Sequence, residues 1–118
     1  MKKLIFYSYP KCSTCRKPSK WLDENNINYQ FIDIVKAPPS KETLAIALIQ
    51  FSSDIKKIFN TRGKSYKLIE INILKLPKKR IIELLLNDGK LIKRPFLIIN
   101  ESKLILGFNE SEYAAKLK

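Results

Sequence analysis

The only two cysteines of the 118-residue chain are Cys12 and Cys15, within the segment SYPKCSTCRK at residues 8–17. Two thiols at this spacing could bind a metal ion, form a structural disulfide or carry out thiol–disulfide exchange. A structural zinc site takes about four Cys or His ligands, and the chain has no histidine, so we expect no metal site. A disulfide across so short a loop removes little entropy from the unfolded chain. We therefore favour redox chemistry.

The surroundings of Cys12 suit a reactive thiolate. Three basic residues flank it in the sequence: Lys11, Arg16 and Lys17. Cys12 also falls between a predicted strand and a predicted helix, where unpaired backbone N–H groups stabilise a negative sulfur. Both effects lower the pKa of the Cys12 thiol, and the thiolate is the nucleophile. With no histidine in the chain, activation by a Cys–His pair is excluded.

The second thiol is placed to complete an exchange reaction. Ser13 and Thr14 are the first residues of the predicted helix, and Cys15 follows one turn after Cys12. A thiol at that distance can attack a disulfide formed at Cys12 and so release whatever Cys12 has captured.

The elements around the two cysteines form a β-α-β unit. Residues 2–9 are a short apolar and aromatic run that predicts a buried strand, and residues 13–26 predict a helix with Trp21 and Leu22 on its inner side. Residues 27–34 predict a second strand. This order predicts a parallel pair with a right-handed crossover, and C-x-x-C beside such a unit is typical of redox proteins.

The middle of the chain is predicted to be helical. Ser40 caps a helix that runs to about residue 51, a shorter helix covers 54–59, and a third covers 78–87. Residues 65–75 are ambiguous, although helical turns are expected there.

The C-terminal part predicts a hairpin and a helix. Residues 96–100 and 103–106 read as two strands joined by a tight turn, and Asn109 or Ser111 caps a last helix that ends near residue 117. Residues 1–118 are thus expected to form a single α/β domain, with a helical insertion at roughly residues 40–88 between its two halves.

Arg94 and Pro95 come directly before the first strand of this hairpin. In thioredoxin-like folds, a cis-proline before a strand packs beside the redox cysteine. We predict that Pro95 is that residue, although an ordinary trans proline at a strand start is the alternative. Arg94 would then face Cys12, whereas its alternative role is a solvated surface charge.

Composition limits the remaining function classes. The net charge is +12, which fits a solvated lysine surface but leaves an acidic partner open. No pattern of a sequence-specific nucleic-acid binder is visible, and no apolar run approaches the roughly 18 residues of a membrane span. The apolar run at residues 4–7 is too short for a signal peptide. We expect a cytoplasmic monomer that binds neither membranes nor, in a sequence-specific way, nucleic acid.

Six segments carry a resemblance to a known family. In order along nearly the whole chain they are YPKCSTCRK, WLDENNI, APPSKETL, FNTRGKSYK, LIKRPFLI and LGFNESEY. With them the sequence resembles the arsenate reductase (ArsC)/Spx family of thioredoxin-fold proteins. The resemblance implies a glutaredoxin-like fold: a four-stranded mixed sheet with a helical insertion between βαβ and ββα halves.

For the arsenate reductases, the resemblance implies a nucleophile at Cys12 and an oxyanion-binding arginine at Arg94. A second family arginine aligns with Asn60, with Arg62 two residues on, and the third aligns near Gly107, where no arginine stands. The two departures weaken arsenate binding, since guanidinium groups match an oxyanion. The resemblance implies an oxidoreductase with no bound cofactor, and glutathione or thioredoxin as the electron donor.

The Spx-type members imply a second function. They share the C-x-x-C, the Arg-Pro pair at 94–95 and a Thr-Arg-x-Lys segment, here residues 61–64. They use the disulfide as a stress switch and bind the C-terminal domain of the RNA polymerase α subunit. Asp54 departs from the glycine that matters for that contact. We favour the oxidoreductase and keep the redox-switched regulator as the alternative.

Overall fold

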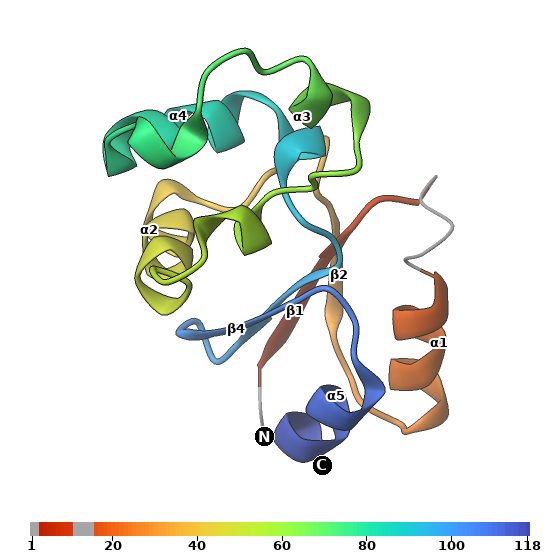
Figure 1. The fold of residues 1–118 in the computed structure, drawn as a ribbon. Helices are drawn as coiled ribbons and strands as arrows, with labels where there is room; N and C mark the ends of the chain where they lie inside the picture. Colours follow the sequence, from red (N-terminus) through yellow and green to blue (C-terminus); the bar gives the residue numbers. More distant parts are fainter. Residues whose placement is uncertain (1–2, 11–15) are drawn as a thin grey trace. The chain divides into compact units, whose positions relative to one another are not determined.

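The computed structural model describes residues 3–10 and 16–118 (Figure 1). The chain divides into two compact units. The first contains the residues up to Asp33 and from Arg94 to the C-terminus, and the second contains Ile34–Lys93.

The first unit is built on a four-stranded mixed sheet of order β2-β1-β3-β4. Its strands are β1 (Leu4–Ser8), β2 (Gln30–Asp33), β3 (Phe96–Ile99) and β4 (Lys103–Leu106). β1 runs parallel to β2 and antiparallel to β3, and β3 runs antiparallel to β4. The predicted fold class and parallel β-α-β pair are confirmed.

One face of this sheet is covered by two helices, α1 (Arg16–Glu24) and α5 (Glu110–Leu117), as Figure 1 shows. Alternate strand residues point to this face because side chains alternate along a strand. Leu22 from α1 and Tyr113 from α5 are fully buried against it. The buried cluster consists of Leu4, Phe6, Leu22, Leu97, Ile99, Ile105 and Tyr113. The shared cluster ties α1 to the strands that flank the cysteine segment.

The second strand is shorter than predicted. The sequence indicated residues 27–34, whereas β2 covers Gln30–Asp33. Asn26 has a positive φ of 56°, and the Ile27 N–H donates to the Leu22 carbonyl at 3.0 Å. Ile27 therefore takes part in ending α1, and both Ile27 and Tyr29 pack against the core.

The predicted hairpin and final helix are present. Asn100 and Glu101 turn the chain with φ values of 51° and 66°, and asparagine tolerates this region well. The Asn100 side chain accepts a hydrogen bond from the Lys3 N–H at 2.7 Å. Asn109, rather than Ser111, caps α5 by accepting from the Glu112 N–H at 3.0 Å.

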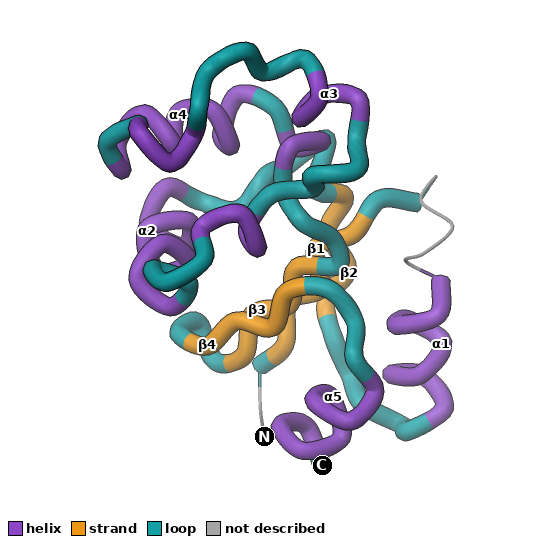
Figure 2. The backbone as a smooth tube through the Cα atoms, viewed as in Figure 1, coloured by secondary structure: helices purple, strands orange, loops and turns teal. Residues whose placement is uncertain are grey.

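The second unit is a succession of short helices and loops, visible in Figure 2. They are α2 (Lys41–Gln50), η2 (Ile55–Ile58), α3 (Lys64–Lys67), η3 (Ile73–Lys75), α4 (Lys78–Asn87) and η4 (Gly89–Leu91). Ser40 caps α2 as predicted, accepting from the Thr43 N–H at 3.2 Å. The helix expected at 54–59 is a 3₁₀ turn, and η4 was not predicted.

Backbone hydrogen bonds hold the end of this unit to its middle. Phe59 and Ile92 form an isolated antiparallel bridge. The Asn60 N–H donates to the Leu91 carbonyl at 2.7 Å, and the Lys93 N–H donates to the Ile58 carbonyl at 2.8 Å. These bonds satisfy backbone groups of buried residues, as the interior of a fold requires.

Gly89 is required by a close approach of two backbone segments. A Cβ at this position would overlap the carbonyl oxygen of Ile34 and lie 2.9 Å from the Cα of Val35. Backbone atoms cannot rotate away, and overpacking of this kind costs about 1–3 kcal/mol.

We expect Gly89→Ala to lower the free energy of unfolding, measured in urea, by more than about 2 kcal/mol.

Gly63 provides the matched control. A Cβ there would meet mainly the Asn60 side chain, with Nδ2 at 2.6 Å, and a side chain can adopt another rotamer. Gly63→Ala should cost less than about 1 kcal/mol. Equal losses in the two variants would contradict the role assigned to Gly89.

Candidate functional site

The register of two neighbouring strands sets the geometry of the site. Tyr7 near the end of β1 is the Cα partner of Phe96 at the start of β3, and their rings meet edge to face at 5.9 Å. The chain leaves β1 through Ser8 and Tyr9 toward the cysteine segment. Since β1 and β3 are antiparallel, the residues that follow β1 and those that precede β3 lie at the same end of the sheet.

The Arg94–Pro95 peptide bond is cis, as predicted. Pro95 is buried, and its carbonyl accepts a hydrogen bond from the Gly107 N–H at 2.9 Å. Gly107 has a φ of 75° and follows directly after β4. This bond connects the approach to β3 with the exit of β4, and so holds the backbone next to Arg94.

Arg94 is partly buried and lies over an aromatic ring. Its guanidinium carbon is 5.2 Å from the centroid of the Tyr9 ring, within the range of a cation–π interaction. Its Nη1 atom is buried and has no hydrogen-bond partner among residues 3–10 and 16–118. A buried guanidinium nitrogen normally has a hydrogen-bond acceptor.

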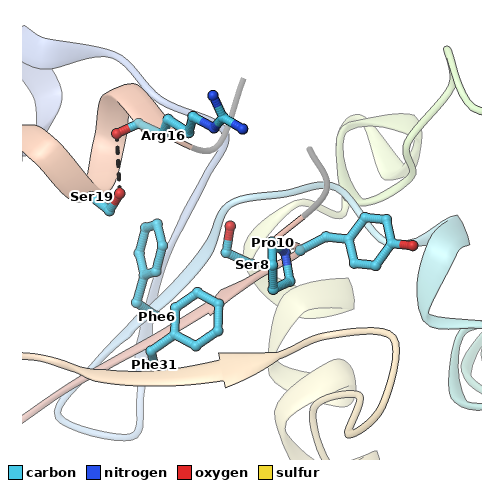
Figure 3. Close-up of a pocket in the computed structure, with 7 residues that line it drawn as sticks. Phe6, Ser8, Pro10, Arg16, Ser19 and Phe31 are labelled. Carbon is cyan, nitrogen blue, oxygen red and sulfur yellow. Dashed lines mark hydrogen bonds between the residues drawn. The ribbon is translucent and has the colours of Figure 1, made fainter. Parts of the chain in front are cut away.

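A small pocket of about 80 Å³ lies between the end of β1 and the start of α1. Phe6 and Phe31 come from the strands, whereas Arg16 and Ser19 come from the helix (Figure 3). The Ser19 hydroxyl donates to the Arg16 carbonyl at 3.0 Å. This volume has room for a few water molecules.

Comparison with protein families decides the identity of the chain. Residues 7–116 match the ArsC family. The chain belongs to the ArsC family. The match covers both halves of the sheet and the helical segment between them.

The curated relatives of this ArsC-family chain include both uncharacterised and regulatory proteins. The uncharacterized protein YusI of Bacillus subtilis is 41% identical, with 93% of this chain and 94% of YusI aligned. The regulatory protein MgsR of the same organism is 35% identical, over 92% of this chain and 86% of MgsR. The global transcriptional regulator Spx of Enterococcus faecalis is 33% identical, over 92% of this chain and 82% of that Spx protein.

Solved structures agree with the family assignment. A possible arsenate reductase from Streptococcus mutans superposes with a TM-score of 0.87 at 35% identity, covering 97% of this chain and 99% of the other. The ArsC fold is therefore shared over nearly the full length of the chain.

The structure describes only some of the predicted site residues of this ArsC-family protein. Five of them lie outside the described residues: Lys11, Cys12, Ser13, Thr14 and Cys15. Arg16 is the exposed first residue of α1, in the same unit as Arg94 and Pro95. Arg62 belongs to the second unit, where it is exposed in the turn before α3. The predicted roles of these residues remain predictions.

Tyr9 is a site residue that the sequence analysis missed. It stands three positions before Cys12 and contacts Arg94, which is far away in the sequence. Sequence spacing carries no signal for such a pair, because the contact depends on the register of β1 and β3.

No group of three or more His, Cys, Asp or Glu residues gathers as a metal site in the part of the chain that the structure describes. Within the same residues, no helix is both long and apolar enough to cross a membrane.

Two tyrosines of the first unit have altered acidity. Burial raises the pKa of Tyr7. Burial also raises the pKa of Tyr29, whose hydroxyl additionally donates to the Asp23 carboxylate at 3.2 Å, and the carboxylate charge acts in the same direction. In both cases the neutral phenol is favoured in the folded state.

These tyrosines predict a loss of stability at alkaline pH. When folding raises the pKa of a tyrosine, the neutral phenol stabilises the folded state. This stabilisation is complete below the tyrosine pKa of the unfolded chain, about 10, and is lost as the pH rises through the higher pKa of the folded state. We expect the loss of unfolding free energy between about pH 8 and pH 11 to be smaller in Tyr7→Phe and Tyr29→Phe, measured by urea unfolding. Asp23→Asn should give part of the Tyr29→Phe effect. An unchanged pH dependence in all three variants would contradict the assignment.

Proposed function

We propose that this ArsC-family chain is a thiol–disulfide oxidoreductase in which Cys12 is the nucleophile and Cys15 resolves the intermediate. The observation that carries the proposal is the pairing of Tyr7 with Phe96. It brings the strand end that leads into the cysteine segment beside the strand start that presents Arg94. A nucleophile and a cation at one end of a sheet suit a reaction that builds negative charge on sulfur.

The proposed reaction transfers two electrons to a disulfide substrate. The Cys12 thiolate attacks one substrate sulfur, a mixed disulfide forms, and the other sulfur leaves as a thiolate that takes up a proton. The Cys15 thiolate then attacks the Cys12 sulfur and releases the second substrate thiol. The two cysteines end as a disulfide, which glutathione or thioredoxin reduces to restore the dithiol.

Arg94 is proposed to stabilise the negative charge at each step. Its guanidinium is partly buried, and Tyr9 supports it from one side. A cation acts more strongly on a thiolate where water is partly excluded. The leaving thiolates and the two carboxylates of glutathione are negatively charged, so they would also be attracted.

A disulfide suits this site better than arsenate does. The positions aligned with two oxyanion-binding arginines hold Asn60 and Gly107. The N–H of Gly107 is already bonded to the Pro95 carbonyl. One guanidinium can stabilise a thiolate, whereas an oxyanion is held best by several guanidinium forks.

The test is reduction of a small-molecule disulfide, bis(2-hydroxyethyl) disulfide, with glutathione as donor, and reduction of insulin with thioredoxin as donor. Cys12→Ser should abolish turnover, because it removes the attacking sulfur. Cys15→Ser should accumulate a mixed disulfide at Cys12, detected by mass spectrometry. Wild-type turnover by Cys12→Ser would show that the nucleophile is wrongly assigned.

The thiolate absorbance of Cys12, followed against pH in Cys15→Ser, tests the role of Arg94 in the same proposal. The pKa of Cys12 should lie below the ordinary thiol value of about 8.5, and Arg94→Ala should raise it. Arg80→Ala, at an exposed position of α4 in the second unit, removes the same charge and should leave the pKa unchanged. Equal shifts of the Cys12 pKa in Arg94→Ala and Arg80→Ala would mean that this pKa depends only on the net charge of the protein, and not on the position of Arg94.

A redox-switched regulator is the second candidate function, favoured by the similarity to MgsR and Spx. In this proposal, the state of Cys12 and Cys15 alters affinity for the C-terminal domain of the RNA polymerase α subunit. The purified domain should bind this chain with an affinity that differs at least about fivefold between the reduced and diamide-oxidised forms. The Cys12→Ser variant should lose the difference. Absence of binding in both states would remove this candidate.

A further inference from the structure

The second unit carries a groove that the redox proposal does not use. It lies between α2 and α4, which pack against one another, and has a volume of about 450 Å³. Residues from both helices line it, among them Lys41, Ala45 and Ile49 of α2 and Lys78, Ile82 and Leu86 of α4. Volumes of 300–1,000 Å³ are typical of ligand sites, so this groove is large enough to hold a partner.

The floor of the groove is apolar and partly open to solvent. Ile49 is 69% exposed and Leu86 is 37% exposed. Each has an apolar residue one helical turn before it, Ala45 before Ile49 and Ile82 before Leu86. An apolar stripe on a helix normally faces another element.

The composition of α2 strengthens this point. Leu44, Ala47 and Leu48 are buried and account for the inner side of the helix. Ala45 and Ile49 add apolar groups on a side that the chain itself leaves partly exposed. A helix that is apolar on nearly all sides is expected to be covered on nearly all sides.

The groove is lined by three lysines and one carboxylate, that of Glu83, so its charge is mainly positive. Lys41 begins α2, and Lys78 and Lys79 begin α4. None of the three lysines pairs with a carboxylate within residues 3–10 and 16–118. The first turn of α4 contains no acidic residue and its N-cap, Pro77, provides no side-chain cap. Cations at the positive end of a helix dipole are unfavourable, and a bound carboxylate would relieve them.

We infer that the groove between α2 and α4 binds an acidic amphipathic helix of a partner protein. The apolar face of the partner would lie on Ile49, Ile82 and Leu86, and its carboxylates would meet the lysine rim. α2 has ten residues, which gives a groove of about 15 Å and room for roughly three turns of a partner helix.

Two other occupants fit less well. A second copy of this chain, with its net charge of +12, would bring lysine rims together. A flat anionic membrane would meet the lysines but would leave a concave apolar floor unfilled.

The probe is a fluorescein-labelled helical peptide of about 14 residues, with leucines at i, i+3, i+4 and i+7 spacing and glutamates elsewhere. Fluorescence anisotropy with the whole protein should show saturable binding. The same peptide with lysine in place of glutamate, and a scrambled peptide of equal composition, should each bind at least about tenfold more weakly.

Variants of the protein locate the binding. Lys78→Glu with Lys79→Glu should weaken binding at least about tenfold, whereas Lys56→Glu with Lys57→Glu, exposed in η2 and outside the groove, changes the net charge equally and should have little effect. Ile49→Asn should weaken binding, and Leu68→Asn, also exposed but outside the groove, should not.

Four results would overturn the inference. The first is that the acidic peptide does not bind, and the second is that the two charge-reversal pairs weaken peptide binding equally. The third is a concentration-dependent dimer in light scattering that Ile49→Asn abolishes. The fourth is that the protein binds phosphatidylglycerol vesicles but not the peptide. Because neither Cys12 nor Arg94 is changed, disulfide reductase activity should stay at the wild-type level in all four protein variants, so failure of this inference is distinguishable from failure of the redox proposal.

Discussion

The antiparallel register of β1 with β3 is the constraint on which the candidate site depends. With Tyr7 opposite Phe96, the residues after β1 and the residues before β3 emerge at the same end of the sheet. A slip of one residue would turn every side chain of the strand to the opposite face, and Leu4 and Phe6 would leave the buried cluster. The hydrophobic core and the position of Arg94 beside Tyr9 are therefore consequences of the same pairing.

The core also fixes the helix that follows the cysteine segment. Leu22 of α1 and Tyr113 of α5 are fully buried in the same cluster, with the Tyr113 ring against Trp21 at 5.7 Å and Phe108 at 4.8 Å. Closely packed core side chains hold a helix in one orientation. The start of α1, the end of β1 and the start of β3 are thus held by elements that take no part in the chemistry.

The sequence predicted those features that depend on local pattern. The strand order within each half, the Ser40 cap and the hairpin follow from alternation, capping residues and turn residues. The cis bond at Pro95 was predicted from its position directly before a strand of a thioredoxin-like fold. The predicted extent of β2 was wrong. Residues 27–29 have a composition that suits a strand, but the Ile27 N–H donates to the Leu22 carbonyl at the end of α1 instead of pairing in the sheet. The Tyr9–Arg94 contact and the close approach of Gly89 to Ile34 join residues distant in sequence, and no single-sequence pattern encodes them.

The strength with which a cation of this chain acts on a nearby anion depends on how far the cation is buried, and not on how many cations the chain has. The described ion pairs, Lys3–Glu101, Lys20–Glu24 and Lys116–Glu112, are all exposed, and such pairs contribute about 0–1 kcal/mol because water and salt screen them. Arg94 differs because its Nη1 is buried and its guanidinium rests on an aromatic ring. Its field is less screened over the distance to a neighbouring anion. A single partly buried arginine can therefore influence a thiolate more than many surface lysines, so a high net charge on its own says little about function.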